Sequence, residues 1–97
     1  MTLVELAKEL QDDLVEGIQN FIIYKEGKQW KRYGFSSYDT EDFMPEDEED
    51  KEEYNRVKSI DHKAIIVNGY NNFPNYTLQF IQYQIKNIYN SPYNVWQ

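Results

Sequence analysis

The side chains of this chain with the clearest chemical potential are carboxylates crowded into one segment. Ten acidic residues and one lysine lie between Asp39 and Glu53, so the segment carries a charge of −9 in a chain whose total is −7. The rest of the chain has a small positive excess of +2. Clustered carboxylates can ligate divalent cations, exchange protons in catalysis or present negative charge to a basic partner. The ten are Asp39, Glu41, Asp42, Glu46, Asp47, Glu48, Glu49, Asp50, Glu52 and Glu53.

The first two of these chemistries fit the sequence poorly. An EF-hand loop needs acidic or amide residues at alternate positions and a glycine at its turn, whereas residues 47–50 are consecutive acids. Acid–base catalysis needs carboxylates whose environments separate their pKa values, which an exposed run does not provide. The chain has no cysteine, and its one histidine, His62, has no serine or cysteine nucleophile beside it. We therefore expect no enzymatic activity, no metal site and no cofactor.

The third chemistry fits, because part of the acidic segment is predicted to be helical. From Pro45 to about Ser59 the composition favours a helix, since proline suits the first helical position and the acidic residues precede basic ones as the helix dipole prefers. Carboxylates four positions apart on a helix lie about 6 Å apart along its axis. Duplex DNA presents one charge per strand about every 3.4 Å, so a row of such carboxylates can imitate phosphates in a basic channel. Two rows are available, Glu46–Asp50–Glu53 and Glu49–Glu53.

Two apolar residues, Phe43 and Met44, interrupt the acidic segment. Apolar residues rimmed by charge are common at interfaces, although Phe43 can equally pin a loop to the core. The alternative for the whole segment is a solvated run that keeps a small protein soluble. The predicted partner-binding residues are Asp39, Glu41, Asp42, Phe43, Met44, Glu46, Asp47, Glu49, Asp50 and Glu53.

The elements that must position this segment begin with an amphipathic helix. Apolar residues from Leu3 to Ile18 recur every three or four positions, Thr2 and Glu5 form a capping box, and the helix is expected to end near residues 17–20. A short apolar run, 64–67, then predicts a strand buried on both faces.

Two further features complete the carboxyl half. Residues 70–75 form a turn-rich stretch, followed by a helix capped by Asn75 or Thr77 and stopped at Ser91-Pro92. The tail from Tyr93 to Gln97 is expected to dock on the body.

Residues 20–35 predict a β-hairpin that turns at Gly27. Its basic residues alternate with aromatic ones, which resembles a platform for single-stranded nucleic acid. Attraction between this hairpin and the acidic segment is an equally good explanation of the pattern. Because the whole chain is acidic, we expect no direct binding of nucleic acid. The basic residues are Lys25, Lys28, Lys31 and Arg32.

The order of these elements predicts an α+β fold. An N-terminal helix, a β-hairpin, an acidic helix, a short buried strand and a C-terminal helix give about three antiparallel strands packed against two helices. With 97 residues, 1–97 are expected to form a single domain that exposes the acidic segment 39–53. No apolar run reaches the roughly 18 residues of a membrane span, and the amino terminus is acidic where a signal peptide is basic. We therefore expect a cytoplasmic protein.

A cysteine-free α+β chain of this size, with a capped helix, a hairpin and an exposed acidic helix, resembles the small inhibitors of phages and mobile elements. Anti-CRISPR and antirestriction proteins in that group act as DNA mimics. The resemblance implies a protein-binding inhibitor whose acidic segment occupies the basic channel of a nucleic-acid-binding protein, such as a CRISPR effector or a restriction nuclease. The alternative is an accessory interaction domain that binds through its tyrosine-rich carboxyl half, where tyrosines supply amphipathic contact area.

Overall fold

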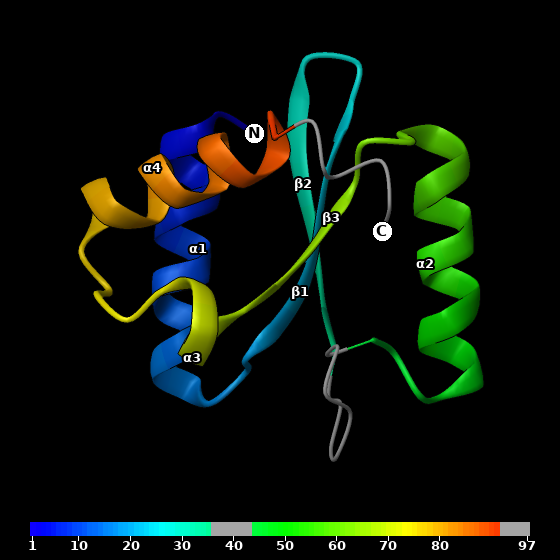
Figure 1. Cartoon of the computed structure of the whole chain (residues 1–97), viewed down its shortest axis with the longest axis horizontal. Helices are drawn as coiled ribbons and strands as arrows, with labels where there is room; N and C mark the ends of the chain where they lie inside the picture. Colours follow the sequence, from blue (N-terminus) through cyan, green and yellow to red (C-terminus); the bar gives the residue numbers. More distant parts are fainter. Residues whose placement is uncertain (36–43, 92–97) are drawn as a thin grey trace.

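The computed structural model describes residues 1–35 and 44–91. The described part contains a three-stranded antiparallel sheet in the order β2-β1-β3, with helices on both of its faces (Figure 1). Helices α1 and α4 cover one face, and α2 covers the other. The α+β fold predicted from the element order is therefore confirmed. The elements are α1 (Leu3–Glu16), β1 (Asn20–Glu26), β2 (Gln29–Phe35), α2 (Glu48–Ile60), β3 (Ile65–Asn68), α3 (Gly69–Asn72) and α4 (Leu78–Tyr89).

Helix α1 begins and ends as its local sequence predicts. The Thr2 hydroxyl accepts a hydrogen bond from the Glu5 backbone N–H at 3.2 Å, and the Glu5 carboxylate accepts one from the Thr2 N–H at 3.1 Å. This reciprocal capping box satisfies two amides that have no partner within the helix. Gly17 ends the helix with φ of 97°, a left-handed conformation that glycine adopts without steric cost.

The hairpin loop sets the register of β1 against β2. A two-residue loop, Gly27-Lys28, joins β1 to β2, and Gly27 has φ of 64°, as such tight loops require. The strands pair from Glu26↔Gln29 to Asn20↔Phe35. On its other edge β1 pairs with β3, from Ile23↔Ile65 to Asn20↔Asn68.

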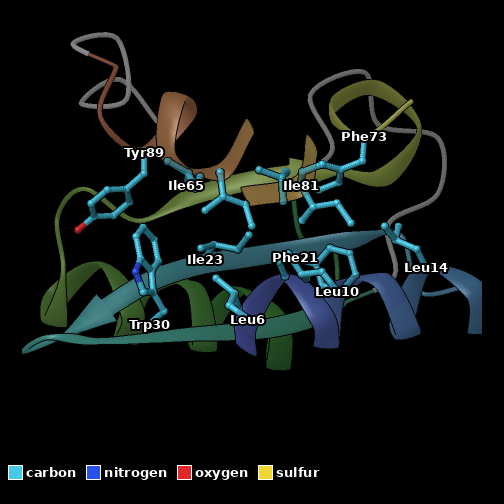
Figure 2. Close-up of a cluster of buried hydrophobic side chains, with 13 residues drawn as sticks. Leu6, Leu10, Leu14, Phe21, Ile23, Trp30, Ile65, Phe73, Ile81 and Tyr89 are labelled. Atoms are coloured by element: carbon cyan, nitrogen blue, oxygen red, sulfur yellow. The ribbon is translucent and has the colours of Figure 1, made fainter. Parts of the chain in front are cut away.

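Alternate residues of β1 face two separate hydrophobic clusters. Phe21 and Ile23 point toward α1 and α4 (Figure 2), where they pack among buried residues such as Leu6, Leu10 and Ile81. The other face of the strand packs against α2. This arrangement follows from the two-residue period of a strand, which allows a continuous apolar run to be buried on both sides. The second cluster consists of Ile22, Tyr24, Phe35, Val57 and Ala64.

The acidic helix begins three residues later than its composition predicts. It starts at Glu48 with Asp47 as the N-cap, whereas the expected start was Pro45. Pro45 is buried, so it anchors the chain as it enters the helix and does not form the first helical turn.

The stretch predicted as turns, 70–75, begins inside a short helix. The Asn68 side-chain oxygen accepts from the backbone N–H groups of Tyr70 and Asn71, and this cap starts the single turn of α3. Thr77 is the N-cap of α4, and the Asn75 side chain accepts from its backbone N–H at 2.9 Å. The tail expected to dock, 93–97, and the stop at Pro92 lie outside the described residues.

Candidate functional site

Helix α2 has one face on the sheet and one face in solvent. Val57 is completely buried, and Tyr54 and Ile60 pack beside it against the second cluster. These apolar contacts lie in the carboxyl half of the helix. The amino half projects most of its side chains outward and displays acidic groups.

The exposed carboxylates around the start of α2 form the acidic surface of this protein. Glu48 lies 3.7 Å from Lys51, and both side chains are at least half exposed, so this ion pair neutralises little charge. Glu48 and Glu52 were not among the predicted binding residues, although both belong to the same acidic run. The members of the acidic surface are Glu46, Asp47, Glu48, Glu49 and Glu52.

Asp50 is turned toward the sheet and does not belong to this surface. Its Oδ1 accepts a hydrogen bond from the Tyr33 hydroxyl on β2 at 2.6 Å. That bond, together with burial and the negative charges of Asp50, Glu49 and Glu53, raises the pKa of Tyr33 to about 12. Asp50 thus fixes the amino half of α2 over β2.

Glu53 also has a partner within the molecule, Arg56. The Arg56 Nε donates to both of its carboxylate oxygens, at 3.1 and 3.2 Å. This charged hydrogen bond holds the pKa of Glu53 below its usual value, despite an opposing effect of burial. Of the predicted row Glu46–Asp50–Glu53, one residue precedes the helix and the other two have internal partners.

The remaining predicted binding residues divide into two groups. Met44 is half-buried where the chain enters α2. The others, Asp39, Glu41, Asp42 and Phe43, lie outside the described residues.

Three of the four basic residues of the hairpin interact within the molecule: Lys25 lies over the Trp30 ring, and Lys31 and Arg32 form ion pairs, whereas Lys28 is exposed. Arg32 forms ion pairs with Glu9 at 3.1 Å and Asp13 at 2.7 Å on α1, and Lys31 pairs with Glu26. Trp30 is only 8% exposed, so its ring cannot serve as a stacking surface for a base. Among the described residues, the Tyr33 hydroxyl joins the hairpin to Asp50 near the start of α2, and the Lys25 backbone N–H joins it to Asp61 at the other end.

Asp61, which was not predicted as a functional residue, accepts several hydrogen bonds at the carboxyl end of α2. Its carboxylate accepts from the backbone N–H groups of Lys25 and Lys63, at 2.9 and 3.0 Å, and from the Tyr89 hydroxyl. Burial opposes ionisation of Asp61, but these three donors outweigh it and hold its pKa below the usual value. The role of Asp61 is therefore to join three elements, and its carboxylate is not available to a partner.

The carboxyl half exposes tyrosines on a different surface. Tyr70 on α3 and Tyr83 on α4 are 67% and 64% exposed, while Tyr89 is buried. Tyr76 is exposed to a lesser extent, and Tyr93 lies outside the described residues.

Two other kinds of site are absent from the part of the chain that the structure describes. Residues 1–35 and 44–91 hold no group of three or more histidine, aspartate or glutamate side chains placed to bind a metal ion. Within the same ranges, none of the helices has the length and apolar character needed to cross a membrane.

Comparison with known proteins identifies a family. A family model described as large polyvalent-protein-associated domain 15 matches residues 1–94. No curated protein and no solved structure matches the chain significantly.

Proposed function

The chain belongs to the large polyvalent-protein-associated domain 15 family, and from this premise we propose that it is a non-enzymatic interaction domain of a phage or mobile element. Its acidic surface binds a basic surface on a partner protein. The family description supports an accessory role beside larger proteins, and an accessory role of this kind requires a binding surface.

The observation that supports this proposal is that some residues of α2 hold the helix on the sheet while others expose their carboxylates to solvent. Val57 and Tyr54 hold the carboxyl half on the sheet, and Asp50 fixes the amino half to Tyr33. The acidic surface is therefore presented on a supported helix. Preorganised charge of one sign steers a partner of opposite sign and fixes its orientation.

The basic surface that we propose is the nucleic-acid channel of a nuclease. Glu48 and Glu52 are four positions apart, about 6 Å along the helix axis, and Asp47 and Glu49 lie beside them. Carboxylates at this spacing can take the place of backbone phosphates among lysine and arginine side chains. The partner is then a nucleic-acid-binding protein of the bacterial cytoplasm, such as a CRISPR effector or a restriction nuclease, and binding inhibits it.

A capture experiment tests this function with matched variants. The double variant Glu49→Gln, Glu52→Gln removes two charges from the acidic surface, and Asp12→Asn, Glu16→Gln removes two exposed charges from α1. Wild type and the α1 variant should capture the same nucleic-acid-binding protein from a nuclease-treated bacterial lysate, identified by mass spectrometry. The α2 variant should lose it. Equal capture by all three proteins would reject the acidic surface as the binding site.

The second candidate is binding through the exposed tyrosines of α3 and α4. The exposure of Tyr70 and Tyr83 supports it, because tyrosine contributes large contact area at interfaces. In that case Tyr83→Ala abolishes capture and the α2 double variant does not.

A further inference from the structure

Strand β2 is an outer strand of the sheet, and its free edge is largely unpaired. Residues flanking a two-residue loop form a hydrogen-bonded pair, so Glu26 and Gln29 bond to each other and the pattern alternates along the hairpin. Lys31 and Tyr33 therefore direct their backbone groups toward β1. The backbone N–H and C=O groups of Trp30, Arg32 and Gly34 point to the outer edge.

Met1 occupies the first of these positions. The Trp30 N–H donates to the Met1 carbonyl at 2.9 Å, and the Met1 amino group donates to the Trp30 carbonyl at 3.3 Å. These two bonds are those of one antiparallel strand pair. The chain then turns away into α1, and within residues 1–35 and 44–91 the backbone groups of Arg32 and Gly34 at this edge have no partner.

The edge lies beside the acidic end of α2. Tyr33, between Arg32 and Gly34, donates its hydroxyl to Asp50. Glu49 and Glu53 belong to the same helix as Asp50, and their charges also act on this hydroxyl. A strand added to the edge would therefore have one face toward carboxylates.

We propose that the outer edge of β2 binds an extended segment of the partner protein as a fourth strand. The segment runs antiparallel to β2, as Met1 does where it pairs with Trp30. It carries lysine or arginine on the face toward α2. Its backbone satisfies the free groups of Arg32 and Gly34, and its cations meet the acidic side of the helix. This inference rests on the basic partner proposed above and names how that partner binds.

A second copy of this chain fits the edge less well. Pairing β2 with β2 of another copy would bring the acidic ends of two α2 helices to the same side of the joined sheet. Like charges in such positions repel each other. The charge of the edge thus favours a basic segment over self-association.

The test uses two synthetic peptides with the same backbone pattern. One alternates threonine with lysine over eight residues, and the other alternates threonine with glutamate. Amide hydrogen exchange in the full chain, followed by NMR, should slow at least tenfold at Arg32 and Gly34 when the lysine peptide is added. Exchange at Lys31 and Tyr33 should change little, because their amides already bond to β1.

Each other outcome overturns the inference in a recognisable way. If the lysine peptide shifts signals of α2 without slowing Arg32 and Gly34, strand addition is wrong while the acidic surface remains a binding site. Equal protection by the glutamate peptide would contradict the charge preference. Protection that grows with protein concentration alone would identify a second copy as the occupant. Absence of any binding would leave no role for the edge.

A pair of variants at one position separates the backbone from the side chain. Arg32→Pro removes an outward N–H and leaves the β1 pairing intact, since proline is tolerated on a free edge. Arg32→Ala removes the same side chain and keeps the N–H. The proline variant should bind the lysine peptide about fivefold more weakly than the alanine variant, the effect of one lost hydrogen bond. Equal affinities of the two variants for the lysine peptide would reject strand addition at the outer edge of β2. If the proline variant does not fold, the hydrogen-exchange experiment on wild type decides whether a strand is added.

Discussion

The Tyr89 hydroxyl on α4 donates to Asp61 Oδ2 at 2.7 Å, and Asp61 is the C-cap of α2. The bond links helices that cover opposite faces of the sheet. The Tyr89 ring also packs edge-on against Trp30, with 5.0 Å between ring centroids, and the two rings lie together in Figure 2. Both contacts help to hold the end of the molecule that carries the hairpin loop.

Removal of the hydroxyl should destabilise the fold. We expect Tyr89→Phe to lower the free energy of unfolding by about 1–2 kcal/mol, because a hydrogen bond to a charged acceptor is lost while the ring contacts remain. Urea denaturation followed by circular dichroism measures this change. Tyr83→Phe on the exposed side of the same helix is the control and should have no effect. Equal stability of the two variants would show that the bond contributes nothing.

Stability should also fall in acid because of Asp61. The pKa of Asp61 is lower in the folded chain than its ordinary value of 3.8, so ionisation of Asp61 stabilises the fold above that value. The contribution is lost as the pH falls through the lower, folded pKa. Asp61→Asn should be less stable than wild type at pH 7, and the difference should shrink below about pH 4. Urea denaturation at several pH values checks this, with Asp12→Asn as an exposed control; a difference independent of pH would contradict it.

A close approach of backbone and side chain should make Gly69 sensitive to substitution. A Cβ atom at this position would lie 2.3 Å from Leu14 Cδ2, and the Gly69 N–H donates to the Gln19 carbonyl at 2.7 Å. We expect Gly69→Ala to cost about 1–3 kcal/mol, the range for overpacking a filled core. In a double-mutant cycle, Leu14→Ala should remove part of this cost. Additive effects of the two substitutions would show that the contact is not the cause.

Salt dependence should distinguish the two proposed binding surfaces. Association through the acidic surface should slow steeply between low and physiological ionic strength, because screening weakens electrostatic steering. Association through Tyr70 and Tyr83 should change little. Stopped-flow or surface plasmon resonance measurements with the captured partner provide the rates. A rate that does not depend on salt would favour the tyrosine surface.

The helix cap and the hairpin loop of this fold can be predicted from short stretches of sequence. Thr2 and Glu5 are three residues apart and cap α1 as predicted, and Gly27 marks the hairpin loop because the conformation there favours glycine. The spacing of apolar residues also predicted α1 and α4, since a helix repeats every 3.6 residues. The predicted start of α2 was wrong by three residues, because Pro45 is buried ahead of the helix and Asp47 is the N-cap.

The amino-acid sequence alone shows where the negative charge lies along the chain, because charge is a property of residue type. Which carboxylates face solvent depends on how α2 lies on the sheet. Asp50 and Glu53, predicted as binding residues, have partners at Tyr33 and Arg56, while Asp61 collects donors from residues 36 and 28 positions away. Pairings over such distances depend on strand register and on the layer that each helix covers. Neighbouring residues do not encode them, so they appear only when the chain is folded.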